Sequence, residues 1–480
     1  MQLLSVASEI YPLIKTGGLA DVAGALPSAL AEHGIAVRTL VPGYPSLLSK
    51  VDKAKAVRRY DTLFGAPATV LAAKAGDLDL LILDAPDFFA REGGPYGDMG
   101  GADWPDNWRR FAALSRVGAD IAADGVKGWR PDLVHAHDWQ AAMTAAYMRF
   151  GPAHAVPKVV TIHNLAFQGR FGADIFASLD LPAEAWAVDG VEYYGGIGFL
   201  KGGLVSADAI TTVSPTYAQE IRSPVHGMGL DGLINGRADR LHGILNGVET
   251  AIWDPATDAL IARRYTARAL GARSSNRRAL EKHFALDRDD APIFIIVSRL
   301  TWQKGMDIVV GAIDHLVGLG GKLAVLGSGD HPLEGAFLAA ADRHRGRVGA
   351  QIGYDEPLSH LMQAGADAIL IPSRFEPCGL TQLYGLRYGC VPVVARVGGL
   401  ADTVIDANEA AVGAGAATGL VFPPADPLAL HGAIARTVQL HSDKSLWQAM
   451  QRAGMRADFS WTHSAARYAD LFRTLVQGAA

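Results

Sequence analysis

The sequence predicts an α/β protein built from two doubly wound domains, each with a parallel sheet. The first observation is length, because 480 residues exceed what one hydrophobic core normally serves. The second is rhythm: short apolar segments alternate with helical stretches along nearly the whole chain, which is typical of parallel sheets covered by helices. The third is that both halves of the chain carry this rhythm equally. We therefore expect two Rossmann-like domains of similar build.

The expected strands are short apolar runs, each followed by a helical stretch or a turn. In the first half they cover residues 3–6, 37–41, 80–83, 133–137, 159–163 and 209–213. In the second half they cover residues 293–297, 323–326, 348–352, 368–371, 391–395 and 419–422. Open parallel sheets bind ligands beyond the carboxyl ends of their strands, so polar residues that follow these runs are the candidates for a functional site.

A change of pattern marks the boundary between the domains. Residues 243–249 lie between the two sets of strands, and we expect an N-terminal domain over 1–243 and a C-terminal domain over 244–457. In the remaining segment, 458–480, apolar side chains recur with the spacing of one helical face. This spacing predicts a last helix that returns to the N-terminal domain.

Composition limits the class of protein. A net charge of −5 argues against nucleic-acid binding as the main role. Two cysteines give no disulfide framework, and no run of residues has the length and apolarity of a membrane span. The first residues lack the basic start of a signal peptide. We therefore expect a cytoplasmic protein that binds neither membrane nor nucleic acid.

A glycine-rich loop follows the first expected strand. Its residues Lys15, Thr16, Gly17 and Gly18 combine a point charge with two glycines that let the backbone approach a phosphate closely. The plainer interpretation is a glycine-rich turn with a solvated lysine. The loop is not a Walker motif, because no Gly-Lys-Ser/Thr follows at the required spacing. The helix after it contains Pro27, which we expect to kink or split it.

Two strand-end loops of the second half carry charge. Arg299 and Lys304 follow the first strand of that half, where ordinary surface charges would be the plainer interpretation. Glu376 follows the fourth strand, just ahead of a helix expected to begin near Thr381. A helix start offers unpaired N–H groups and a positive dipole end to an anion, while a carboxylate accepts hydrogen bonds from sugar hydroxyls. Together these loops predict a metal-free site for a nucleotide-sugar diphosphate.

Histidines and an aspartate follow two strands of the first half. His135 and His137 share one face of a strand and could bind a metal, but no third ligand lies nearby in the sequence. Asp138, at the strand end, is the better candidate, as an acceptor of hydrogen bonds from a hydroxyl. His163 stands at the corresponding place one strand later, where structural and functional roles remain equally open.

Three further motifs have two interpretations each. Gly327 and Gly329 begin like a dinucleotide fingerprint, but Pro332 occupies the place of the third glycine, so a tight turn explains them equally well. Tyr354 either packs on a base or is a half-buried aromatic at the rim of the sheet. Cys378 has no activating base nearby in the sequence, so we expect its thiol to be structural.

In their order along the chain, these motifs resemble those of bacterial glycogen synthases and plant starch synthases. The resemblance rests on residues 15–19, 135–139, 163–164, 246–247, 299–305 and 376–384. It implies the GT-B fold, in which two Rossmann-like domains face each other across a deep cleft. It also implies transfer of glucose from ADP-glucose to the non-reducing-end 4-hydroxyl of an α-1,4-glucan such as glycogen, with retention at the anomeric carbon and ADP as product.

The resemblance also implies roles for individual residues. The catalytic group would be Glu376 on the glucose hydroxyls, Arg299 and Lys304 on the diphosphate, His163 on the glucose and Asp138 on the acceptor side. The other substrate-binding residues would be Lys15, Gly17, Gly18, Asn246, Tyr354, Cys378, Gly379, Leu380 and Thr381. Many retaining GT-B transferases carry a second glutamate where this chain has Tyr384, and in this the chain is similar to the bacterial synthases.

We expect no cofactor and no metal. Aspartate pairs with the spacing used by metal-dependent transferases occur at Asp77 and Asp79 and at Asp287 and Asp289, but neither pair follows a convincing strand. Cations and a helix dipole can stabilise the departing diphosphate instead. A double displacement would need a carboxylate within reach of the anomeric carbon, and the neighbours of Glu376 suggest hydroxyl binding. We therefore expect attack by the acceptor hydroxyl on the face that the leaving group departs from.

Three other classes of protein remain as alternatives. The first is another GT-B transferase that uses UDP-glucose or a small sugar-phosphate acceptor. The second is an oxidoreductase with tandem Rossmann domains, which the broken glycine fingerprint disfavours. The third is a noncatalytic glucan-binding protein, which Arg299, Lys304 and Glu376 together disfavour. The sequence leaves open the oligomeric state, the choice between ADP-glucose and UDP-glucose, the distal glucan surface and any regulation.

Overall fold

A computed structural model describes residues 1–479, which form two compact α/β units. Unit 1 comprises Met1–Gly247 together with the segment from Trp461 onward, and unit 2 comprises Val248–Ser460. The junctions lie a few residues beyond the boundaries expected from the sequence. One reason is that Gly247 packs against Trp461, where an added Cβ would lie 2.6 Å from the backbone nitrogen. No helix within residues 1–479 is long and apolar enough to cross a membrane.

Unit 1 is built on a nine-stranded sheet with the order β12-β11-β7-β6-β1-β2-β5-β4-β3. Its parallel strands are β1 (Gln2–Val6), β2 (Ala36–Pro42), β5 (Leu78–Asp84), β6 (Leu133–His137), β7 (Lys158–Ile162), β11 (Ala209–Thr212) and β12 (Leu241–Gly243). At one edge, β3 (Asp52–Leu63) and β4 (Ala66–Ala75) form an antiparallel hairpin. A separate antiparallel sheet contains β8 (Arg170–Phe171), β10 (Gly196–Gly198) and β9 (Glu192–Tyr193).

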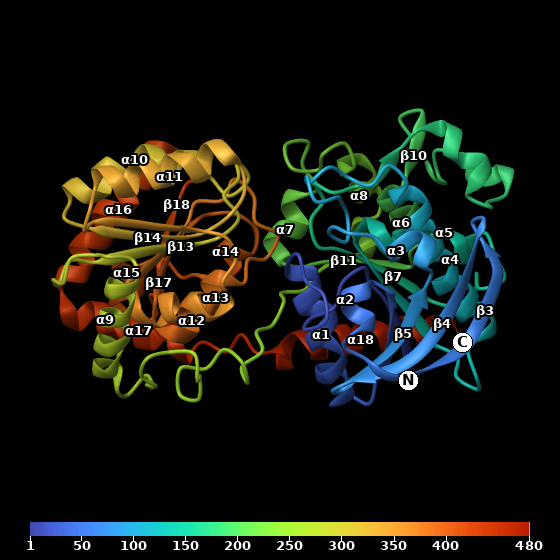
Figure 1. Cartoon of the computed structure of the whole chain (residues 1–480), viewed down its shortest axis with the longest axis horizontal. Helices are drawn as coiled ribbons and strands as arrows, with labels where there is room; N and C mark the ends of the chain where they lie inside the picture. The colour runs from blue at the N-terminus through green and yellow to red at the C-terminus, as the bar shows by residue number, and fades with distance from the viewer. Residues whose placement is uncertain (480) are drawn as a thin grey trace. The chain divides into compact units, whose positions relative to one another are not determined.

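Helices cover both faces of the large sheet (Figure 1). On one face α1 (Gly18–Ala31) and α18 (Trp461–Ala479) enclose a core with strand residues such as Leu3 and Leu133. The other face packs against α4 (Asn107–Asp124), α5 (Asp138–Arg149) and α6 (Phe199–Ser206). Helix α1 continues past Pro27, so it is not split there; its buried apolar face holds it together despite the missing N–H donor. The short helices are α2 (Pro45–Leu48), α3 (Pro86–Phe89), η1 (Ala173–Ser178), η2 (Ala183–Ala185), α7 (Pro215–Glu220), α8 (Asp231–Gly236) and η3 (Ala238–Arg240).

Unit 2 has a six-stranded parallel sheet with the order β15-β14-β13-β16-β17-β18. The strands are β13 (Ile293–Val297), β14 (Lys322–Gly327), β15 (Val348–Ile352), β16 (Ala368–Ile371), β17 (Val391–Ala395) and β18 (Leu420–Phe422). They match the second set expected from the sequence, because strands buried on both faces read as continuous apolar runs.

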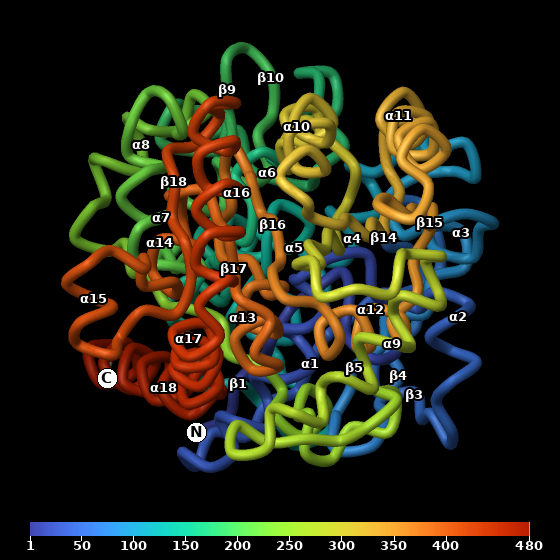
Figure 2. Tube along the Cα trace, turned by 90° about the vertical axis from the view of Figure 1, so that its left-hand side faces the viewer, coloured from blue at the N-terminus to red at the C-terminus, as the bar shows by residue number. Residues whose placement is uncertain are grey.

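The helices of unit 2 also lie on both faces of its sheet, as Figures 1 and 2 show. On one side are α10 (Met306–Gly318), α11 (His331–Arg343) and α16 (Pro427–Ser442), which packs against α10. On the other are α9 (Arg273–His283), α12 (Glu356–Gly365), α13 (Thr381–Tyr388) and α17 (Lys444–Arg456). The remaining short helices are η4 (Leu270–Ala272), α14 (Gly398–Thr403) and α15 (Glu409–Gly413).

In both sheets the order in which successive strands are added reverses at a central strand. In unit 1, β2 and β5 lie on one side of β1, while β6, β7 and β11 lie on the other. In unit 2, β14 and β15 lie on one side of β13, while β16, β17 and β18 lie on the other. The loops after β1 and β6, and those after β13 and β16, therefore start at a topological switch point, where open α/β sheets bind ligands. The charged and glycine-rich motifs of the sequence fall on these loops.

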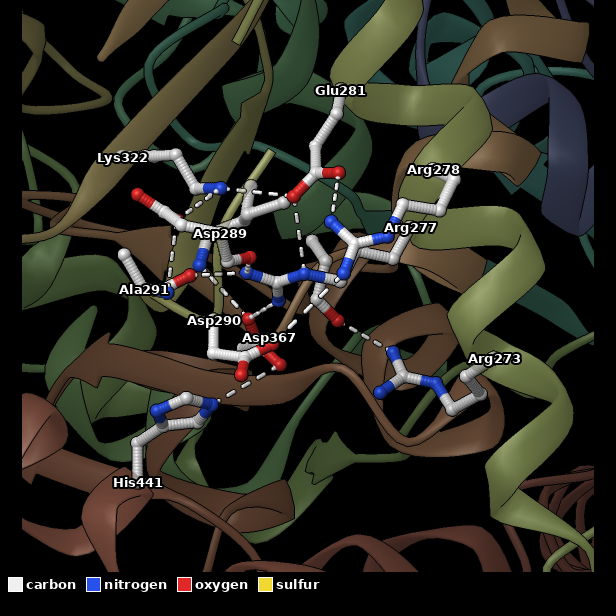
Figure 3. Close-up of polar contacts among 12 residues, drawn as sticks. Arg273, Arg277, Arg278, Glu281, Asp289, Asp290, Ala291, Lys322, Asp367 and His441 are labelled. Carbon is white, nitrogen blue, oxygen red and sulfur yellow. Dashed lines mark hydrogen bonds and ion pairs between the residues drawn. The ribbon is translucent and has the colours of Figure 1, made fainter. Parts of the chain in front are cut away.

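Buried and part-buried ion pairs lie at the opposite, amino-terminal edge of the unit 2 sheet, as Figure 3 shows. Lys322, fully buried at the start of β14, lies 2.9 Å from Glu281 of α9. Arg277 of the same helix lies 2.6 Å from Asp367, just before β16. Burial alone would raise the pKa of Asp367, but His441 and Arg277 outweigh it and hold the pKa well below its usual value. These contacts fasten α9 to the sheet at the end remote from the ligand-binding loops.

Candidate functional site

Two loops meet at the switch point of unit 2 and bring a lysine and a carboxylate together. Residues 298–305 connect β13 to α10, and residues 372–380 connect β16 to α13. Lys304 Nζ of the first loop lies 2.5 Å from Glu376 Oε2 of the second. Ser373 Oγ donates to the same oxygen at 2.9 Å. Because Glu376 is buried, these two charge-assisted contacts fix the direction of its carboxylate.

Glycines let these loops approach each other closely. Gly305 has φ +71°, and an added Cβ would lie 2.1 Å from the carbonyl oxygen of Pro372. At Gly398 and Gly399, where α14 begins, an added Cβ would lie within 2.1 Å of a carbonyl oxygen of the second loop. The backbone N–H of Gly399 also donates to the carbonyl of Glu376 at 3.1 Å. The sequence analysis missed this pair, whose available signal was two adjacent glycines after a predicted strand.

The second loop leads directly into α13, whose first residue is Thr381. Gln382 donates from Nε2 to the carbonyls of Cys378 and Gly379, at 3.0 and 2.8 Å. Leu380 occupies the N-cap position and makes no side-chain cap. The backbone ahead of the helix is thus fixed by Gln382, while the first-turn N–H groups have no partner within the helix. Gln382 was not among the predicted site residues.

The exposed predicted residues of unit 2 are Arg299 and Tyr354. Arg299 lies in the loop after β13, five positions before Lys304, and its side chain is exposed. Tyr354 follows β15 and is 75% exposed, with its hydroxyl bonded to Glu356. Both side chains are accessible to a ligand at the carboxyl edge of the sheet, while Lys304 and Glu376 are already paired with each other.

In unit 1 the loop after β1 carries Lys15, Gly17 and Gly18. Lys15 Nζ lies 2.7 Å from Asp21 in the first turn of α1 and 5.2 Å from the ring centre of Tyr11. Gly17 occupies the N-cap of α1 without a side-chain cap, and Gly18 is the first helical residue. Both glycines are exposed, and the space around Gly17 is open. The N-terminus of α1 is therefore accessible to an anion.

Asp138 follows β6 but is the first residue of α5, with φ +55°. Its Oδ1 accepts a hydrogen bond of 2.7 Å from the backbone N–H of His163 and a longer one from Asn164. Burial raises the pKa of Asp138 to about 7, although these hydrogen bonds act in the opposite direction. The carboxyl therefore titrates near neutral pH. Its hydrogen bonds to the N–H groups of His163 and Asn164 hold the first residues of the loop after β7 in place.

The three predicted histidines of unit 1 are buried. His137 Nδ1 lies 3.0 Å from His163 Nε2, and His135 Nε2 lies 2.5 Å from Thr161 Oγ1. Burial lowers the pKa of all three, that of His137 to about 3, so they are uncharged at neutral pH. One ring of the His137–His163 pair must donate and the other accept, so their tautomers are linked. Within residues 1–479 no group of three or more His, Cys, Asp or Glu side chains is arranged to hold a metal.

Asn246 lies next to the last residue of unit 1 before the chain passes into unit 2. Its side chain is buried, and no donor in the described part of the chain lies within hydrogen-bond distance of Oδ1. Native structures satisfy nearly all buried acceptors, so an unpaired amide oxygen marks a place where a ligand hydroxyl or a water fits.

The same sheets and loops recur in known proteins. The family model of the starch synthase catalytic domain matches residues 2–236, and that of glycosyl transferases group 1 matches residues 279–454. Glycogen synthase of Mesorhizobium japonicum is 63% identical over 476 residues, which cover 99% of each chain. The chain belongs to the glycogen synthase family.

Other members of the glycogen synthase family agree over the same length. Glycogen synthase 1 of Rhizobium meliloti is 61% identical over 477 residues, and glycogen synthase of Novosphingobium aromaticivorans is 59% identical over 479 residues. The catalytic domain of starch synthase IV from Arabidopsis thaliana, solved with ADP and acarbose bound, matches with a TM-score of 0.88, 30% identity and 99% coverage of each chain. These matches confirm the predicted family and the GT-B fold. Sucrose-phosphate synthase from Thermosynechococcus elongatus, at 18% identity and a TM-score of 0.60, shares the fold.

Proposed function

We propose that this member of the glycogen synthase family transfers glucose from ADP-glucose to the non-reducing-end 4-hydroxyl of an α-1,4-glucan, with retention and without a metal. The observation that carries the proposal is the pairing of Lys304 with Glu376 beside the start of α13. A sugar nucleotide needs positive charge and a helix N-terminus for its diphosphate, and a carboxylate for its hydroxyls. The ADP bound to the related starch synthase IV supports an adenine nucleotide as leaving group.

In this proposal the donor is held mainly by the carboxyl edge of unit 2. Arg299 and Lys304 contact the diphosphate, and the backbone N–H groups of residues 378–381 meet the distal phosphate. Glu376 accepts hydrogen bonds from the glucose hydroxyls, and Tyr354 lies by the adenine. Lys304 then contacts two anions, the donor diphosphate and the carboxylate of Glu376. It thereby connects the group that binds the diphosphate to the group that binds the glucose.

Unit 1 contributes the remaining groups. Lys15 and the backbone of Gly17 and Gly18 add positive potential at the diphosphate, while Asp138 lines the acceptor side. The Oδ1 of Asn246, which has no hydrogen-bond partner within residues 1–479, accepts from a glucose hydroxyl. The buried ring of His163, whose Nε2 faces His137, also contacts the glucose.

The positions of the aspartate pairs support a metal-independent reaction. Asp79 lies at the start of β5 and pairs with Arg38 at 3.3 Å. Asp289 precedes β13 and lies 2.8 Å from Lys322 at the amino-terminal edge of unit 2. Both pairs thus stand at the amino ends of strands, whereas the donor loops stand at the carboxyl ends. Side-chain cations and the α13 dipole then stabilise the leaving group, at about 3–4 kcal/mol for each essential contact.

The contacts of Glu376 favour same-face attack by the acceptor. Its Oε2 is engaged by Lys304 and Ser373, an arrangement for holding hydroxyls rather than for bonding to the anomeric carbon. The acceptor hydroxyl approaches on the side of the departing diphosphate, and a donor phosphate oxygen takes its proton. Trapping of a glucosyl adduct on Glu376 or Asp138 would contradict this route.

The test is incorporation of labelled glucose into glycogen from ADP-glucose and from UDP-glucose, with a sugar phosphate as a second acceptor. We expect ADP-glucose and glycogen to give the highest kcat/KM, the product to be cleaved by an α-1,4-specific hydrolase, and EDTA to leave the rate unchanged. A preference for UDP-glucose or for the small acceptor would replace the proposed substrates. Strict dependence on an added divalent ion would overturn the electrostatic argument.

A further inference from the structure

Glu9 is a buried carboxylate that accepts hydrogen bonds from the Lys15–Gly18 loop. The residue is 2% exposed in the loop after β1, and its carboxylate accepts three hydrogen bonds. Two come from Thr16, through its backbone N–H and its Oγ1, the latter at 2.7 Å, and the third comes from the Tyr96 hydroxyl. Since Thr16 stands between Lys15 and Gly17, the carboxylate sets the conformation of the loop at its centre.

Tyr96 is itself held in place by other groups of unit 1. Its hydroxyl gives its proton to Glu9 and accepts from Ser8 Oγ at 2.8 Å. Asn107 Nδ2 donates to the carbonyl of Tyr96 at 2.8 Å, and Arg110 donates to Asn107 Oδ1 at 2.6 Å. Asn107 and Arg110 are buried in the first turns of α4. A continuous line of contacts therefore runs from α4 through Tyr96 and Glu9 to the glycine loop.

The sign of the charge excludes direct phosphate binding by Glu9. A carboxylate beside a diphosphate would repel it, and a buried anion is tolerated where its hydrogen bonds compensate for lost hydration. Glu9 meets that condition through Thr16 and Tyr96. An exposed loop with two glycines loses much conformational entropy when it is ordered, so fixing it in advance favours the binding of a ligand.

We propose that Glu9, held by Tyr96, is a positioning residue for the donor: it keeps Lys15, Gly17 and Gly18 in the conformation that receives the diphosphate. The inference rests on the proposed role of this loop in donor binding. Glu9 and Tyr96 act through Thr16 and do not contact the substrate, so their loss should change donor kinetics and leave acceptor kinetics alone.

Tyr96→Phe removes the hydroxyl and keeps the ring on Phe111. In the full-length protein we expect kcat/KM for ADP-glucose to fall about tenfold and ADP binding to weaken by a similar factor, as loss of one charge-assisted hydrogen bond implies. The KM for glycogen should stay unchanged. The matched control is Tyr147→Phe, which removes the hydroxyl of another buried tyrosine of unit 1, one that donates to the Leu179 carbonyl at 2.7 Å and makes no contact with Glu9 or Tyr96. Its kcat/KM for ADP-glucose should stay within about twofold of wild type.

Two further variants separate this inference from the proposed function. Glu9→Gln and Lys15→Ala should each lower kcat/KM for ADP-glucose by about a hundredfold, and the double variant by less than the product, because both act through one loop. If Lys15→Ala leaves kcat/KM for ADP-glucose unchanged, both the proposed donor role of the loop and this inference are wrong. If Lys15→Ala is impaired while Tyr96→Phe and Glu9→Gln behave like Tyr147→Phe, the inference alone is wrong. Should Glu9→Gln fail to fold, Tyr96→Phe decides.

Discussion

Lys304 is the residue on which the electrostatic argument depends most directly. Its replacement by alanine removes one cation from the proposed diphosphate site, so we expect kcat to fall by two to three orders of magnitude, about 3–4 kcal/mol of transition-state stabilisation. Turnover with ADP-glucose and glycogen measures the effect, and thermal unfolding checks that the fold persists. Lys282→Ala, at an exposed lysine of α9, is the control. Activity of Lys304→Ala within tenfold of wild type would contradict the phosphate assignment.

The titration of Asp138 has a consequence for stability. Its pKa is raised from 3.8 to about 7 in the folded state, so the folded protein binds more protons than the unfolded chain between these values. The contribution of this carboxyl to the unfolding free energy is therefore largest at low pH and is lost as the pH rises towards 7. Between pH 5.5 and 7.5 the loss amounts to about 2 kcal/mol.

Asp138→Asn isolates this effect, because the amide oxygen can still accept from the His163 N–H while the titration is gone. Denaturant unfolding of both proteins at the two pH values gives the measurement. The stability of wild type relative to Asp138→Asn should decrease on going to the higher pH. A constant or increasing difference would mean that the folded-state pKa is not raised.

The sequence indicated candidate residues at the ends of strands, but not the residues that contact and orient them. Glu376 and Lys304 were found because each follows an apolar run, and the structure brings them into contact. Glu9 was not, although Thr16 of the glycine-rich loop is only seven positions away, because a carboxylate beside a phosphate-binding loop has the wrong charge for the ligand. Its other partner, Tyr96, is 87 positions away and lies in no recognisable motif. Ser373 was missed although it precedes Glu376 closely, since many loop serines are ordinary solvated residues.

At the scale of elements, the junction of β13 with α10 depends on one glycine. Gly305 has a left-handed conformation, and an added Cβ would collide with the Pro372 carbonyl of the neighbouring loop. Gly305→Ala should therefore destabilise unit 2 by about 1–3 kcal/mol and displace Lys304 from Glu376, with loss of activity. Thermal unfolding and turnover are the measurements.

The same helix supplies a contrasting substitution. Gly311 lies inside α10 and has no neighbour within 4 Å of an added Cβ. Gly311→Ala should stabilise the protein by about 0.5–1 kcal/mol and leave activity unchanged, because alanine loses less backbone entropy in a helix. Equal effects of the two substitutions would show that the close approach of the loops is unimportant.

The central parallel strands were predictable, whereas the short edge strand β12 and the β3–β4 hairpin were not. Central parallel strands are buried on both faces and appear as uninterrupted apolar runs. Strand β3 lies at the edge of its sheet and is largely exposed, with lysines and arginines among its residues, and β4 is rich in alanine. Such compositions contain few of the residues that favour strands, and the pairing of β4 with β5 joins two segments of very different composition.

At the scale of the whole molecule, α18 makes the end of the chain part of the first folding unit. Phe472 is fully buried between α18, α1 and the sheet. Phe472→Ala should therefore destabilise unit 1 by about 3–5 kcal/mol and leave the unfolding of unit 2 nearly unchanged. Calorimetry, with proteolysis to identify the unit that unfolds first, measures this.

Gln477→Ala, at an exposed position of the same helix, is the control and should change stability by no more than about 0.5 kcal/mol. If Phe472→Ala lowered the stability of both units equally, they would unfold as one body and not as separate domains.

The two crossings of the chain between the units have a practical consequence. Residues 248–460 are one continuous stretch, and their ends lie together, since the Val248 N–H donates to the Phe459 carbonyl at 2.8 Å. Such a stretch can be exchanged between homologous enzymes by joining just two peptide bonds. Chimeras made this way would reveal whether the nucleotide preference travels with the transplanted module or stays with the host.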